Sequence, residues 1–74
     1  MDQARTREHL AEADNKIEKA EKRIADQRER IAELSADGHT TAEAEKLLST
    51  YLDVFEAMVE HRKTILDELA KDAP

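Results

Sequence analysis

The sequence has no cysteine, which excludes disulfides and thiolate-ligated metal sites. It also has no tryptophan, a single tyrosine, a single phenylalanine, one glycine and one proline. No apolar run approaches the ~20 residues that a membrane-spanning helix needs. A chain of 74 residues can bury only a small core. Small domains without a disulfide or a metal often gain stability by oligomerisation, so self-association is a leading expectation.

Charged residues make up 41% of the chain, with 18 acidic and 12 basic side chains and a net charge of −6. This balance disfavours non-specific binding to nucleic acids and to anionic membranes. The opening segment, MDQARTREHLAEAD, lacks the apolar core of a secretory signal. We therefore expect a cytoplasmic protein with no nucleic-acid partner and no membrane partner.

The scarcity of glycine and proline leaves long segments rich in strong helix formers. In the first half, large apolar residues recur every seven positions, and a second set follows each of them by three. These sets are Leu10, Ile17, Ile24 and Ile31, then Ala13, Ala20, Gln27 and Leu34. This heptad pattern predicts a coiled-coil-like helix over about 3–36. Its outer face carries three i,i+4 pairs expected to add weak support: Glu12–Lys16, Glu18–Lys22 and Asp26–Arg30.

Stop and start signals for helices lie close together near the middle of the chain. Gly38 can adopt the left-handed conformation that ends a helix. Thr40 and Glu43 fit a capping box, in which each side chain bonds the other residue's backbone N–H. We expect a turn at about 37–40, a second helix over about 41–71 and a frayed tail from residue 72. Residues 1–74 then form one all-α domain, an antiparallel helical hairpin.

The second predicted helix is much more apolar than the first. Mirroring the helices about the turn pairs Ile31 with Leu48, Ile24 with Phe55, Ile17 with Arg62 and Leu10 with Leu69, within one helical turn. The first helix offers five large apolar residues and the second offers eleven. We therefore expect a homodimer, a four-helix bundle in which the second helices meet. The expected dimer or partner interface is Leu48, Tyr51, Leu52, Phe55, Met58, Val59, Arg62, Ile65, Leu66 and Leu69.

Arg62 lies near the centre of this apolar face, and two interpretations remain open. Its aliphatic stem can pack while the guanidinium reaches water. Alternatively, it pairs with Asp14 or Glu21, or with an acid of another subunit, and fixes the register of the assembly. Gln27 interrupts the first helix's apolar stripe in a similar way.

No arrangement of residues points to catalysis. Neither a Glu-x-x-His pair nor an HExxH motif occurs, and there is no nucleophile elbow or glycine-rich phosphate loop. The basic residues of KIEKAEKRIADQRER alternate with acids, as on a solvated coiled-coil exterior. We expect a non-enzymatic interaction module without cofactor or metal. The alternative is a regulatory adaptor whose second helix binds a helix of a different protein.

Three segments, RIADQRERIAEL, DGHTTAEAEKLL and EHRKTILDEL, carry a resemblance that covers nearly the whole chain. The chain resembles a group of short uncharacterised helical-hairpin proteins from alphaproteobacteria. The matching residues are Asp37, Gly38 and His39, then Thr40 and Glu43, then His61, Arg62, Ile65 and Leu66. The resemblance implies a helical hairpin and no known activity, and it makes His39, His61 and Arg62 the first positions to test.

Overall fold

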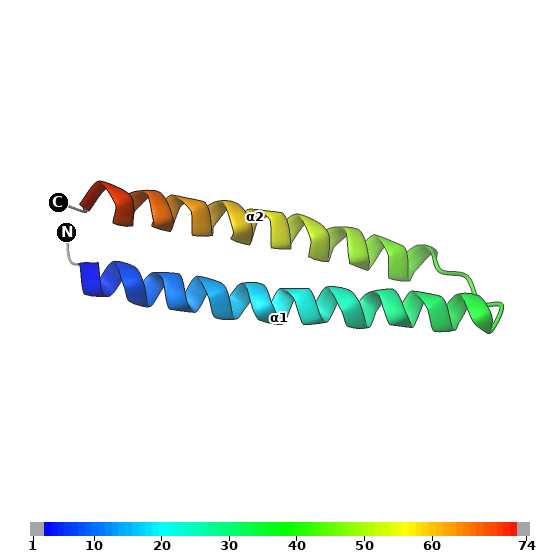
Figure 1. Cartoon of the computed structure of the whole chain (residues 1–74). Coiled ribbons are helices and arrows are strands. Elements are labelled where there is room, and N and C mark those ends of the chain that lie inside the picture. Colours follow the sequence, from blue (N-terminus) through cyan, green and yellow to red (C-terminus); the bar gives the residue numbers. More distant parts are fainter. Residues whose placement is uncertain (1–2, 73–74) are drawn as a thin grey trace.

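A computed structural model describes residues 3–72, which form two helices packed against each other (Figure 1). Helix α1 spans Gln3–Ala36 and helix α2 spans Ala42–Asp72. The helices run antiparallel, so the start of α1 and the end of α2 lie at the same end of a rod of 59 × 15 × 12 Å. The predicted all-α hairpin is confirmed. The tail predicted to fray includes Asp72, which closes α2, and residues 73–74, which lie outside the described residues.

Gly38 ends α1 as the sequence predicts. Its φ of +76° is left-handed, which a residue with a Cβ adopts only with strain. The Gly38 N–H donates to the Ser35 carbonyl at 3.1 Å, and the His39 N–H donates to the Leu34 carbonyl at 2.9 Å. These two bonds are the paired bonds of a Schellman motif, which satisfies carbonyls that the end of a helix leaves without partners.

Helix α2 begins at Ala42, and Thr41 occupies the position before it. The Glu45 N–H donates to the Thr41 carbonyl at 2.8 Å, which is the first hydrogen bond of the helix. Thr41 is therefore the capping position, one residue later than the predicted Thr40. Glu43 lies in the first turn, where its negative charge interacts favourably with the positive end of the helix dipole.

The least exposed positions of each helix follow a heptad spacing, which defines the seam between α1 and α2. In α1 they are Gln3, Thr6, Leu10, Ala13, Ile17, Ala20, Ile24, Gln27, Ile31 and Leu34. In α2 the heptad set is Ala44, Leu48, Tyr51, Phe55, Met58, Arg62, Ile65 and Leu69. The first-half pattern therefore predicted the inward face of α1 correctly.

The register of the seam is shifted from the central predicted pairing by about one helical turn, which is the margin of that prediction. Arg23 lies over the Tyr51 ring, which places Tyr51, rather than Phe55, at the level of Ile24. Arg62 bonds Asp14, so it lies nearer the start of α1 than the predicted partner Ile17. The cause is the turn. Because Gly38 reverses the chain at once, the residues after it already run back along α1, and α1 extends beyond α2 at this end (Figure 1).

The seam buries few residues completely. Among the described residues, Thr6, Ala13 and Ile65 are buried, at 4%, 6% and 4% exposure. The total accessible surface is 5799 Å². A compact folded monomer of 8.4 kDa is expected to expose about 4,600 Å², so this hairpin exposes about a quarter more. The seam therefore leaves much of each helix open to water.

Candidate interaction surfaces

The seam leaves apolar residues of α2 uncovered along one of its flanks, at Leu52, Val59 and Leu66. These three residues are seven positions apart, so they share one face of the helix, here named the leucine stripe. Leu52 and Leu66 are each 37% exposed, and Val59 is partly exposed. In a single hairpin, the leucine stripe therefore remains in contact with water.

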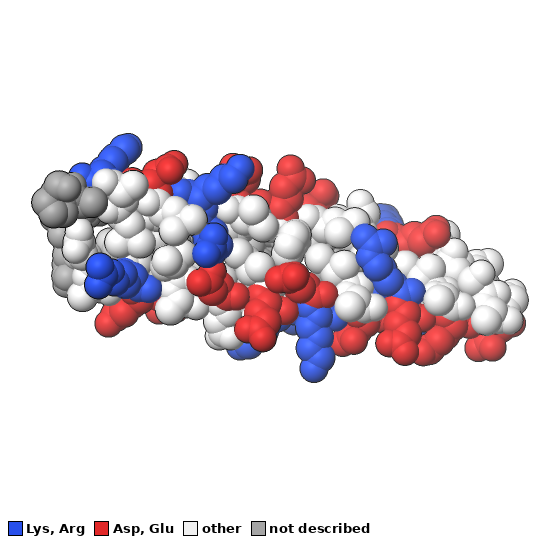
Figure 2. Space-filling model, in the orientation of Figure 1, with Lys and Arg blue, Asp and Glu red and all other residues white. Residues whose placement is uncertain are grey.

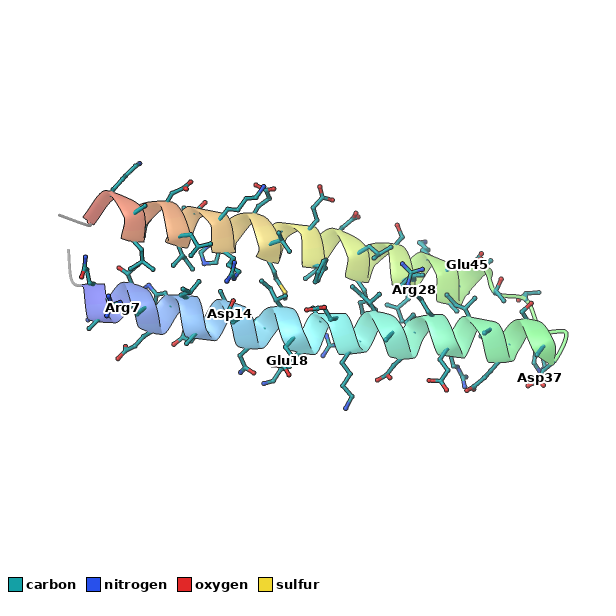
Figure 3. The ribbon with its side chains drawn as sticks, viewed as in Figure 1. Arg7, Asp14, Glu18, Arg28, Asp37 and Glu45 are labelled. Atoms are coloured by element: carbon teal, nitrogen blue, oxygen red, sulfur yellow. The ribbon has the colours of Figure 1, made fainter. Side chains whose placement is uncertain are left out.

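Charged residues of α1 accompany the leucine stripe. The Arg62 Nε donates to Asp14 Oδ1 at 2.5 Å, so the row of α1 that contains Asp14 lies on this side of the seam. That row, at seven-residue spacing, is Arg7, Asp14, Glu21 and Arg28. Both signs of charge appear on the face drawn in Figure 2, with patches of uncharged surface among them. Figure 3 shows Arg28 level with Glu45 along the hairpin, as the register requires.

The ten residues predicted for a dimer or partner interface divide into two sets. Leu52, Val59 and Leu66 form the leucine stripe. The other seven belong to the intrachain seam: Leu48, Tyr51, Phe55, Met58, Arg62, Ile65 and Leu69. The sequence did not separate these sets, because a broad apolar face does not reveal which part of it the neighbouring helix covers.

A hollow of about 320 Å³ lies on the opposite side of the seam. Its apolar floor is formed by Ala20, Tyr51, Val54 and Met58, and its rim by Lys16, Lys19, Arg23 and Thr50. Val54 is 46% exposed, and Leu47, seven residues earlier on the same row, is 43% exposed. The Arg23 guanidinium carbon lies 5.7 Å from the centre of the Tyr51 ring, within the range of a cation–π interaction.

A second hollow of about 470 Å³ continues the first toward the turn. It shares Lys19, Arg23 and Tyr51 with the first hollow and adds Lys22, Asp26, Gln27 and Arg30. The two hollows are neighbours on one flank of the seam, and together they are here named the basic groove. Sequence reasoning missed it, although Lys16, Arg23 and Arg30 recur every seven residues and so predict a basic row on one flank of α1.

Gln27 and Arg62, the two polar interruptions of the apolar pattern, both bond across the seam. The Gln27 Nε2 donates to the Ala44 carbonyl at 2.8 Å, which ties the first turn of α2 to α1. The side chains of Arg62 and Asp14 remain 39% and 51% exposed. Both interpretations of Arg62 therefore hold in part, since its stem lies in the seam while its charge reaches an acid at the surface.

The three histidines lie in two places, two of them beside one hollow and the third in the turn. His9 and His61 line a third hollow, of about 490 Å³, together with Thr6 and Glu68. His39 is exposed in the turn. Within residues 3–72 there is no group of three or more His, Asp or Glu side chains placed to hold a metal ion.

Over the same residues, neither helix combines the length and the apolar character needed to cross a bilayer. Comparisons of the chain with protein-family models, curated proteins and solved structures gave no match.

Proposed function

We propose that this chain is a cytoplasmic, non-enzymatic interaction module that self-associates through the leucine stripe. Two hairpins pack α2 against α2 and form a four-helix bundle. The observation that carries the proposal is the exposure of Leu52 and Leu66, each 37%, on one face of a helix with Val59 between them. An acidic chain without cysteine is compatible with a reducing compartment, where such a module would work.

The proposed contact is isologous and antiparallel. A two-fold axis near Val59 brings Leu52 of one copy against Leu66 of the second copy, and the reverse. The single hairpin exposes about 1,200 Å² more than a compact monomer of its mass, which exceeds the ~800 Å² that each partner buries in a standard interface. The hairpin therefore has enough surplus surface for a dimer contact along the leucine stripe.

The charges beside the two surfaces favour the leucine stripe over the basic groove as the surface through which two copies meet. An isologous interface places a surface patch against its own copy. If two copies met through the basic groove, Lys16, Arg23 and Arg30 of one copy would face the same cations of the other copy. This repulsion disfavours association. Beside the leucine stripe, α1 carries Asp14 and Arg28, so both signs of charge are present.

Matched substitutions on the two sides of α2 test the proposal. Leu52→Glu places a charge in the leucine stripe, and sedimentation velocity should then show a monomer in place of a dimer. Leu47→Glu is the control, because Leu47 is a comparably exposed leucine on the opposite flank of the same helix. It should leave the dimer intact.

Circular dichroism of both variants shows whether the helices persist. Two results contradict the proposal: equal effects of the two substitutions on assembly, or a wild-type chain that is already monomeric.

A further inference from the structure

We propose that the basic groove binds an acidic amphipathic helix from a different protein. The helix would lie along the groove, its apolar stripe against Val54 and Leu47 and its acids toward α1. This inference uses the flank of α2 opposite to the leucine stripe. It does not depend on self-association.

The charge of the groove is opposite to that of the chain. Five of the 12 Lys and Arg residues line it, namely Lys16, Lys19, Lys22, Arg23 and Arg30, and Asp26 is the single acid among the lining residues. The chain as a whole carries −6. A local concentration of cations on an acidic protein attracts anionic partners and steers their approach.

Among the described residues, these cations form no ion pair within 4.0 Å. The helical pairs expected from the sequence, Glu12–Lys16, Glu18–Lys22 and Asp26–Arg30, are not formed. Across residues 3–72 the ion pairs within 4.0 Å are Arg62–Asp14 and Lys63–Glu60, both away from the groove. The charges of Lys16, Lys22 and Arg30 are thus available to a partner.

The distribution of the cations fits a helix better than a single anionic group. Lys16 and Arg30 are separated by roughly 21 Å along α1, at ~1.5 Å per residue. A fatty-acid carboxylate or a free phosphate would engage the cations at one end of this groove. A helix with an acid at every seventh residue meets Lys16, Arg23 and Arg30 in turn, because its repeat matches theirs.

The floor of the groove argues against a nucleic acid as the occupant. Val54, which lines the groove, is 46% exposed, and Leu47, seven residues earlier on the same row of α2, is 43% exposed. A phosphate backbone offers nothing apolar to cover them. An amphipathic helix covers them with its own apolar stripe, which is the helix-in-groove mode of recognition.

The α2 side of the groove leaves room for a third helix. Thr50 lines the rim, and Ala57 and Thr64 follow it at seven-residue spacing, so this row is small and uncharged. The hydroxyls of Thr50 and Thr64 each donate to a carbonyl of their own helix at 3.3 Å. A helix can therefore approach α2 closely while its acids face the cations of α1.

A pair of synthetic peptides tests the proposal with the full chain. Each has roughly three heptads with Ile and Leu at a and d, and the flanking positions are all Glu in one peptide and all Lys in its twin. Fluorescence anisotropy should show the acidic peptide binding at least about tenfold more tightly than the basic twin. Raising NaCl from about 50 mM to about 500 mM should weaken that binding.

Variants locate the binding site. The double substitution Lys16→Glu with Arg23→Glu should lower the affinity for the acidic peptide at least about tenfold. The control Lys46→Glu, an exposed lysine that does not line the groove, should change its affinity less than about twofold. Leu52→Glu, which should abolish the dimer, should leave peptide binding unchanged, so the two proposals can fail separately.

Several outcomes would overturn the inference. They are equal binding of the two peptides, no binding of the acidic peptide, and equal effects of the groove variant and Lys46→Glu. The groove could also bind one of three other probes more tightly than the acidic peptide: a short DNA duplex, a fluorescent fatty acid or anionic phosphatidylserine vesicles. That result would mean that its ligand is an anion other than a helix. If the chain dimerises through the groove and the dimer no longer binds the peptide, the groove is occupied by a second copy of the chain instead.

Discussion

Arg62 of α2 donates from Nε to Asp14 Oδ1 of α1 at 2.5 Å, which joins the two helices beside the leucine stripe. Both side chains remain substantially exposed, at 39% and 51%. Exposed ion pairs contribute only ~0.2–1 kcal/mol, because water screens them and ordering two long side chains costs entropy. The pair is therefore better suited to setting the register of the hairpin, and of the proposed dimer, than to stabilising the fold.

Arg62→Leu should preserve or raise the free energy of unfolding, because an apolar side chain then occupies the seam position. The same change should loosen the assembly, giving mixed oligomers in sedimentation velocity. Asp14→Asn is the companion variant and should lower the free energy of unfolding by no more than ~1 kcal/mol. A loss of folding in Arg62→Leu without any change of assembly state would refute this role.

Gly38→Ala should lower the free energy of unfolding by roughly 1–2 kcal/mol, measured by urea denaturation at fixed chain concentration. The reason is the φ of +76° alone, since an added Cβ would meet no atom within 4 Å. Gly38→Asn should be less damaging, because asparagine tolerates the left-handed conformation better than alanine does. Equal stability of Gly38→Ala and wild type would show that the turn can relax.

Ala13→Leu should destabilise the hairpin by roughly 1–3 kcal/mol, because Ala13 is only 6% exposed in the seam and a larger side chain forces the helices apart. Ala11→Leu is the matched control, since Ala11 is exposed on the same helix. Thermal unfolding followed by circular dichroism compares the two. An unchanged melting temperature for Ala13→Leu would mean that the seam is loosely packed.

The bounds of both helices could be predicted closely, and α1 matched at both ends. The heptad of Leu10, Ile17, Ile24 and Ile31 is a local pattern, and Gly38 is the single interior glycine, so nothing in the sequence competed with this interpretation. The cap of α2 was placed one residue early because Thr40 and Thr41 are equally good caps.

The seam register and the basic groove were beyond the reach of sequence reasoning. The register depends on the path that the chain takes after Gly38, which no pattern within either helix encodes. The groove combines a row of α1, containing Lys16 and Arg23, with Val54 on α2, and these come together only in the correct register. Read along one helix, the same lysines and arginines looked like alternating surface charge.

Val59→Cys tests the orientation of the proposed dimer, since the chain has no native cysteine. A two-fold axis near Val59 should bring the two thiols together, so mild oxidation should yield a disulfide-linked dimer in high proportion. Val54→Cys lies on the opposite flank and should cross-link poorly. Efficient cross-linking of Val54→Cys with little linkage at Val59→Cys would place the self-contact on the basic groove instead.

The most direct test of self-association is sedimentation equilibrium of the unmodified chain at micromolar concentration. Two hairpins covering each other's leucine stripe predict a species of twice 8.4 kDa, with helical content that falls on dilution as the dimer dissociates. A species of 8.4 kDa that keeps its helical content and melts cooperatively at every dilution would contradict the account.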